Sequence, residues 1–138
     1  MERPTTPGEA GRASAGFTLI ELVTVVALIA ILAAIALPNY RVAIIQSKEA
    51  VLKENLFRLR DLIDQYYLDK GQYPATLEAL VEDGYLRQLP KDPITQDADW
   101  TPVFQEPDPD RPGEPPGVFD VKSSSEAPSL AGTPYNEW

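Results

Sequence analysis

The chain of 138 residues contains no cysteine and no histidine. These absences exclude disulfide bonds, thiol nucleophiles, the usual zinc sites and every catalytic arrangement that depends on histidine. Basic residues are also scarce, with 12 Lys and Arg against 21 Asp and Glu, so the net charge is −9. An acidic chain is a poor partner for nucleic acid or anionic lipid. The composition therefore disfavours most enzyme classes and nucleic-acid binding.

Proline is present but unevenly placed, with ten of the 14 prolines lying between Pro90 and Pro134. This density excludes a long helix from the C-terminal third and favours turns and short strands. Apolar residues are concentrated in one run, residues 17–37. The rest of the chain is long enough for one small core.

The apolar run has 21 residues, and a helix of this length spans about 30 Å, the thickness of the hydrocarbon layer. A cleavable secretory signal places its small-residue cut site after the apolar region. Here the small pair Ala15 and Gly16 comes before it, so a cut there leaves the whole apolar helix in the mature protein. Basic residues flank the run on both sides, so charge does not fix its orientation.

The sequence GFTLIELVTVVALIAILAAIALP, residues 16–38, resembles the class III leader and N-terminal helix of type IV pilins and type II secretion pseudopilins. In that family a prepilin peptidase cuts after the glycine, here Gly16, and N-methylates the new first residue, here Phe17. Glu21 and Pro38 match the family's glutamate and proline. Cut site, acid and proline therefore all agree with a subunit that is processed and then assembles.

Glu21 is the unusual residue of the run, because a carboxylate inside a membrane helix costs about 2.5–3.5 kcal/mol and needs a cation or a donor. Processing creates such a cation, the α-amine of Phe17. Our hypothesis is that Glu21 pairs with the Phe17 amine of a neighbouring subunit and sets the axial register of an assembly. The alternative is an interfacial acid that reaches the membrane surface. Thr18 and Thr24 are expected to bond back to the preceding helical turn.

Pro38 has no N–H, so the carbonyl of Ala34 loses its helical partner and the helix is expected to bend or loosen there. One interpretation makes Pro38 the end of the membrane span. The resemblance implies another, in which the segment between Glu21 and Pro38 unwinds when subunits pack into a filament.

Beyond Pro38 an apolar face recurs at helical spacing, and residues 70–71, Lys-Gly, supply a stop signal. One helix is therefore predicted over about residues 18–70. We expect residues 52–66 of this face to lie in the core, and Val42, Ile44 and Ile45 to face other subunits. The face consists of Ile45, Leu52, Leu56, Leu59, Ile63 and Tyr66.

A short second helix is predicted, with Thr76 as its N-cap, Leu77, Leu80 and Val81 on its inner face, and Gly84 following its end. Residues 100–105 and 117–123 alternate as strands do, on either side of a proline-rich turn. The expected fold class is α+β: a long helix packed in its second half against a short helix and a small antiparallel sheet.

The C-terminal region resembles the major, G-type, pseudopilin of type II secretion in three places: residues 84–93, residues 119–123 and the aromatic Trp138. G-type members carry aspartates in a calcium loop that follows the second of these. This chain has one acid there before Glu137, namely Glu126, beside the hydroxyls of Ser123, Ser124 and Ser125, whereas calcium takes six to eight oxygens. No cofactor is expected, with calcium at these four residues as the alternative. Two further acidic clusters are expected to be solvated turn residues: Asp92, Asp97 and Asp99, and Glu106, Asp108, Asp110 and Glu114.

The sequence thus predicts four segments: a leader (1–16), a transmembrane and assembly half of the long helix (17–37), its amphipathic half (38–72) and a small globular region (73–138). The resemblance implies a major pseudopilin, anchored in the inner membrane, that forms a periplasmic filament driving protein export and is not an enzyme. Its implied partners are further copies of itself, the prepilin peptidase, a platform protein with its assembly ATPase, minor pseudopilins and membrane lipid. A type IV pilin for adhesion or motility, and a membrane-anchored binding protein, remain as alternatives.

Overall fold

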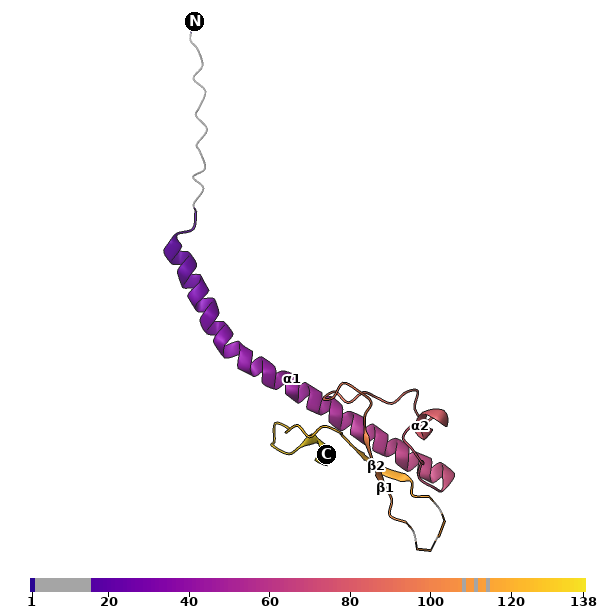
Figure 1. Ribbon diagram of the computed structural model, residues 1–138. Helices are drawn as coiled ribbons and strands as arrows, with labels where there is room; N and C mark the ends of the chain where they lie inside the picture. The colour runs from indigo at the N-terminus through magenta and orange to yellow at the C-terminus, as the bar shows by residue number, and fades with distance from the viewer. Residues whose placement is uncertain (2–15, 108, 111, 114) are drawn as a thin grey trace. The chain divides into compact units, whose positions relative to one another are not determined.

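The computed structural model describes Met1 and residues 16–107, 109–110, 112–113 and 115–138. It contains helix α1 (Leu19–Lys70), helix α2 (Ala79–Glu82), strands β1 (Thr101–Phe104) and β2 (Val118–Lys122), and the 3-10 helix η1 (Tyr135–Glu137) (Figure 1). The predicted α+β fold, with its long helix, short helix and antiparallel sheet, is confirmed. The chain divides into two compact units, Met1–Asn39 and Tyr40–Trp138, which are described separately.

In the first unit, α1 has apolar side chains on every side and is exposed throughout. By length and composition this part of α1 can cross a membrane. A helix that is apolar all round is stable where lipid or other protein covers it. The predicted leader lies outside the described residues, apart from Met1 and Gly16.

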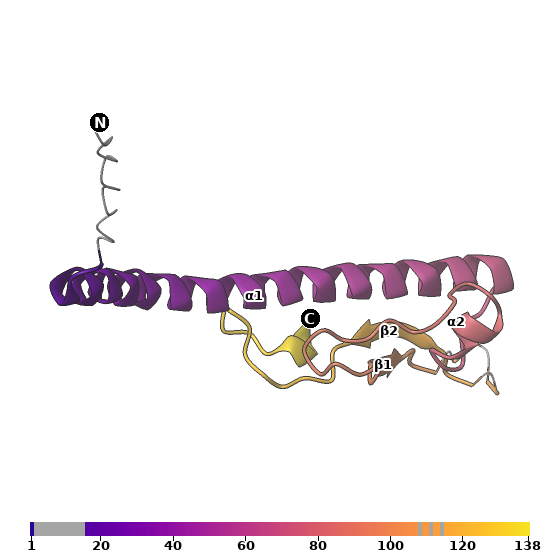
Figure 2. The ribbon, with the colours of Figure 1, turned by 90° about the horizontal axis from the view of Figure 1, so that it is seen from above.

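In the second unit, one face of α1 forms the floor of the hydrophobic core. The elements that follow α1 lie along one side of this part of the helix (Figure 2). The buried positions recur at steps of four, three, four and three residues, which place them on a single stripe. This confirms the predicted core face: the helix contributes Leu52, Leu56, Leu59, Ile63 and Tyr66, and the rest of the unit adds Leu77, Leu80, Trp100, Val118, Val121 and Tyr135.

Ile45 belongs to the same periodic pattern but lies outside the core. Its side chain is 37% exposed, and the neighbouring Val42 and Ile44 are exposed as well. The core therefore begins at Leu52, as the sequence predicted, and the apolar surface before it is left uncovered within the chain.

Both helices end at glycines in the left-handed backbone region. Gly71 has φ 72° and donates its N–H to the carbonyl of Tyr67, and Gly84 has φ 81° after α2. A residue with a Cβ is strained at such angles, which is why glycine follows helix ends. The two predicted helix stops are confirmed.

The start of α2 differs from the prediction. The helix begins at Ala79 and its N-cap is Glu78, which makes no side-chain cap bond, so Thr76 is not the cap. Thr76 instead accepts the N–H of Ala79 through its backbone carbonyl, within a turn that precedes the helix. Leu77 and Leu80 are buried as expected, because this turn and the helix present one apolar side to α1.

The sheet consists of β1 paired antiparallel with β2, with an irregularity between Val103 and Phe104. Val118 and Val121 of β2 are fully buried, and the sheet packs against the core through these two side chains. Arg60 of α1 fixes the sheet to the helix, because its Nε donates to Asp120 Oδ1 over 2.7 Å and its Nη2 donates to the carbonyl of Val121 over 3.0 Å.

Asp92 contradicts the prediction that its cluster is solvated. Its side chain is 0% exposed, whereas Asp97 and Asp99 are exposed. The carboxylate accepts the N–H of Ile94 over 2.7 Å and the hydroxyl of Ser123, the residue that follows β2. A buried carboxylate is stable only with such donors, so Asp92 joins the loop before β1 to the segment after β2.

We expect Asp92→Ala to lower the melting temperature of the detergent-solubilised full chain, followed by near-UV circular dichroism. The hydroxyl of Ser123 and the N–H of Ile94 would lose their acceptor, and each unpaired buried donor costs about 1–3 kcal/mol. Asp97→Ala removes an exposed carboxylate from the same turn and is the matched control. Equal melting temperatures for the two variants would contradict the role assigned to Asp92.

Gly117 is required by a close backbone approach. A Cβ at this position would lie 2.5 Å from Tyr73 Cβ and 2.8 Å from the Tyr73 carbonyl oxygen. We therefore expect Gly117→Ala to destabilise the full chain by about 1–3 kcal/mol in denaturant titration, because backbone must shift to make room. Ala131→Ser also adds one heavy atom, but at an exposed position, and is expected to leave the unfolding midpoint unchanged.

Candidate assembly site

The predicted site residues Gly16, Phe17 and Glu21 come together where α1 begins. Gly16, Phe17 and Thr18 are not helical, and the helix starts at Leu19. Gly16 and Phe17 are exposed, with Phe17 86% accessible. The Gly16–Phe17 peptide bond therefore lies outside regular structure, where an enzyme can reach both its faces.

Thr18 is the N-cap of α1, which corrects the prediction that its hydroxyl bonds back to a preceding turn. Its Oγ1 accepts the N–H of Glu21 over 3.3 Å, and its carbonyl accepts the N–H of Leu22 over 3.1 Å. The described residues before Thr18, Gly16 and Phe17, are not helical, and the Thr18 hydroxyl satisfies a free N–H at the start of the helix instead. A threonine followed three residues later by glutamate is a sequence signature of a helix start, and this signal was missed. Thr24, in contrast, donates to the carbonyl of Ile20 over 2.7 Å, as predicted.

Glu21 thus lies in the first turn of α1, where the helix dipole favours a negative charge by about 0.3–1 kcal/mol. Its backbone N–H is taken by Thr18. Within the part of the chain that the structure describes, its carboxylate has no hydrogen-bond or ion-pair partner. Exposed apolar side chains surround it along the chain, including Leu19, Ile20 and Leu22. The pairing of Glu21 with the amine of a neighbouring subunit stays a prediction.

Pro38 lies inside α1, 17 residues beyond Glu21, and is not brought near the other site residues. The helix stays regular on both sides of it. Pro38 has no N–H to donate to the carbonyl of Ala34. At the neighbouring carbonyl, that of Ile35, the side-chain amide of Asn39 donates over 3.3 Å. The interpretation of Pro38 as a point that loosens in a filament stays a prediction.

The alternative calcium region has its hydroxyls already engaged. Ser123 is buried and donates to Asp92, and Ser124 donates to Asp99 over 2.7 Å. The hydroxyls of Thr95 and Ser124 hold the pKa of Asp99 below its ordinary value. Among the described residues no three or more Asp and Glu side chains are grouped as a metal site requires.

Within the same region Glu126 is exposed, and Ser125 Oγ accepts the N–H of Ala127 over 3.3 Å. Calcium requires six to eight oxygens, several of them carboxylates. Glu126 is the one carboxylate from residues 123–126 themselves, and the hydroxyls of Ser123 and Ser124 are bonded to Asp92 and Asp99. Calcium at residues 123–126 stays an untested alternative.

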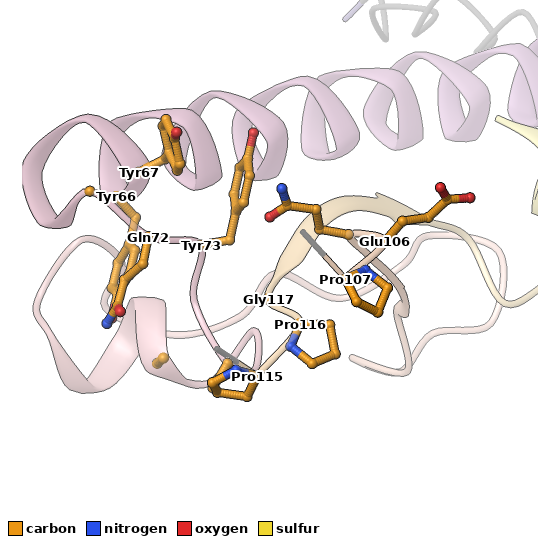
Figure 3. Close-up of a pocket in the computed structure, with 13 residues that line it drawn as sticks. Tyr66, Tyr67, Gln72, Tyr73, Glu106, Pro107, Pro115, Pro116 and Gly117 are labelled. Carbon is orange, nitrogen blue, oxygen red and sulfur yellow. The ribbon is translucent and has the colours of Figure 1, made fainter. Parts of the chain in front are cut away.

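A pocket of about 230 Å³ lies between the C-terminal end of α1 and the connection from β1 to β2 (Figure 3). Tyr67 and Tyr73 stack at one side of it, with ring centroids 4.4 Å apart. Among its described lining residues Glu106 is the single carboxylate, and none is a cysteine, histidine, serine or lysine. The described lining therefore lacks the serine, cysteine and lysine nucleophiles and the histidine base on which many active sites depend.

The chain matches the model of the family described as "Prokaryotic N-terminal methylation motif" over residues 11–37. It is similar to type II secretion system core protein G of Pseudomonas aeruginosa, with 39% identity over 98 residues, 59% of this chain and 69% of that protein. The protein of the same name from Dickeya chrysanthemi is 32% identical over 123 residues, 75% of this chain and 74% of that protein. The one from Vibrio cholerae is 35% identical over 101 residues, 62% of this chain and 69% of that protein. No solved structure matches the chain significantly.

These matches agree with the exposed cut site, the capped helix start with Glu21, and the long apolar helix on a small α+β unit. They favour type II secretion over the alternative of a type IV pilus subunit. The chain belongs to the type II secretion system core protein G family and is a major pseudopilin.

Proposed function

We propose that this pseudopilin is made as a precursor, cut after Gly16 by a prepilin peptidase, N-methylated on Phe17, and polymerised into a periplasmic filament that drives protein export. The observation that supports this most strongly is the first half of α1, which is exposed and apolar on every side. It contains one carboxylate, Glu21, which has no hydrogen-bond or ion-pair partner among the described residues. Before assembly this segment would anchor the subunit in the inner membrane, with residues 40–138 in the periplasm. After assembly, neighbouring subunits would cover it.

The surroundings of Gly16 support the proposed cut. A Cβ on Gly16 would meet no atom of the described residues within 4 Å, and its backbone does not adopt a positive φ. The described part of the fold therefore does not require glycine at position 16. A requirement for glycine would then come from the peptidase, whose cleft must approach the backbone closely.

The state of Glu21 supports the proposed pairing between subunits. Cutting after Gly16 creates a cationic amine on Phe17, two residues before the helix starts. The Thr18 cap occupies the backbone N–H of Glu21 and leaves its carboxylate oxygens available. An ion pair with the amine of a neighbour would neutralise both charges in a medium where a single charge is costly.

The role we propose is mechanical and not enzymatic. Further partners would be a platform protein with its assembly ATPase at the inner membrane, and minor pseudopilins. The acidic character of the subunit agrees with a protein whose partners are other proteins, because its net charge of −9 disfavours nucleic acid.

Deletion of the gene, followed by complementation, tests the function. We expect the deletion strain to retain its secreted proteins in the periplasm, while surface pili and twitching motility are unchanged. The full-length gene should restore release. Loss of twitching with normal release would favour the alternative of a type IV pilus subunit.

Glu21→Ala tests the pairing. We expect at least about a tenfold loss of subunits recovered in filaments, because the neighbour's amine would be left without a counter-ion. The mass of the variant should still show cleavage after Gly16 and one added methyl group, which separates a failure to assemble from a failure to be processed.

Two controls sharpen this test. Glu54→Ala removes an exposed carboxylate further along α1, paired with Arg58 on the helix surface, and should assemble normally. The double variant Glu21→Val, Val25→Glu keeps one acid in the apolar segment but moves it about 6 Å along the helix, and should not assemble. Normal assembly of either Glu21 variant would contradict the proposed pairing.

A further inference from the structure

We propose that Glu49 of α1 organises the C-terminal segment, residues 123–138, by accepting hydrogen bonds from it, so that this segment folds without a divalent cation. The calcium loop that the family resemblance implies would thus be replaced by a carboxylate on the long helix. The inference goes beyond filament formation and concerns how the single subunit is held together.

The geometry at Glu49 carries the proposal. Its Oε1 accepts the backbone N–H of Leu130 over 2.8 Å and the hydroxyl of Tyr135 over 3.0 Å. These partners lie 81 and 86 residues further along the chain. Glu49 is half-buried and Tyr135 is 3% exposed, so the bond between them is partly shielded from water, whereas the bond from Leu130 lies at the surface. Hydrogen bonds to an ionised acceptor are stronger than those between neutral groups.

Around its contacts with Glu49 the segment forms a turn, residues 128–134, that is held by hydrogen bonds within the segment. Ser129 donates its N–H to the carbonyl of Thr133 over 2.9 Å, and the N–H of Gly132 returns to the carbonyl of Ser129 over 2.9 Å. The hydroxyls of Ser129 and Thr133 lie 3.1 Å apart, and Pro128 pairs with Pro134 in an isolated bridge. The turn is therefore held by hydrogen bonds between its own backbone and hydroxyl groups.

Two other side chains of α1 hold the end of the segment. Arg60 Nη2 donates to the carbonyl of Trp138 over 3.0 Å, and Lys53 Nζ lies 4.8 Å from the centre of the Trp138 ring. Glu49, Lys53 and Arg60 are separated by four and seven residues, so they share one face of α1. The segment is thus fixed to the helix at Leu130, Tyr135 and Trp138.

The direction of these bonds explains why a cation is not needed. A calcium ion gathers oxygen acceptors from several parts of a loop. A carboxylate does the reverse and gathers donors, here an N–H and an O–H. Burial, and then the neighbouring Glu49, raise the pKa of Tyr135, so its phenol remains a donor at neutral pH.

The processed full-length protein in detergent tests the proposal by thermal unfolding and by hydrogen exchange of the Leu130 amide. We expect the wild-type melting temperature to be the same in calcium chloride and in EDTA. In Glu49→Ala the Leu130 amide should exchange about tenfold faster or more. Glu49→Gln keeps an acceptor oxygen without charge, and its exchange should be intermediate.

Glu54→Ala, one turn further along α1 on the exposed surface, is the matched control and should exchange at the wild-type rate. If Glu49→Ala does not fold, the calcium comparison on the wild type and the exchange rate of Glu49→Gln still decide the question. A melting temperature that rises with calcium or falls with EDTA would overturn the proposal. Leu130 exchange that is unchanged in Glu49→Gln and in a folded Glu49→Ala would also overturn it.

Discussion

The described part of residues 40–138 depends on the contact between one face of α1 and the short elements that follow it. Neither the four residues of α2 nor a sheet of two strands can bury enough apolar surface to be stable alone. The buried stripe from Leu52 to Tyr66 provides the missing partner surface for both. Because that stripe belongs to a helix that continues toward the N-terminus, the helix that carries the apolar assembly segment is also the floor of the folded unit.

Polar contacts then decide where the irregular segments lie on this core. Asp92 connects the loop before β1 to the residue that follows β2, and Arg60 connects α1 to Asp120. Glu49 does the same for the C-terminal turn. In each case a charged side chain is satisfied by donors or acceptors distant in sequence, and for the fully buried Asp92 this agrees with the rule that buried charge must be paired. A proline-rich chain without disulfides is in this way fixed by carboxylates and one guanidinium.

Helical spacing and turn chemistry were enough to predict α1, the stops at Gly71 and Gly84, and the two strands, because these depend on neighbouring residues. Thr18 as the helix cap could have been predicted from the glutamate three residues later, but its hydroxyl was expected to bond back to a preceding turn, whereas it accepts the N–H of Glu21. Asp92 and Glu49 were beyond such reasoning. Their partners lie 31 and 81 or more residues away, and burial of an acid becomes visible only when those segments meet.

The apolar half of α1 has one further consequence. A helix with apolar side chains on every side packs against copies of itself with almost equal energy at many rotations about its axis and many shifts along it. Apolar contact alone therefore does not select one packing, which is close to degenerate. In the filament that we propose, a single ionisable group would remove that degeneracy. Sliding one copy by a helical turn, about 5.4 Å, would keep the hydrocarbon contact but would place the carboxylate of Glu21 against apolar side chains. The few atoms of the Glu21 carboxylate would thus distinguish one packing of neighbouring helices from packings shifted slightly along the axis. The apolar contact energy, in contrast, would be spread over the whole helix surface.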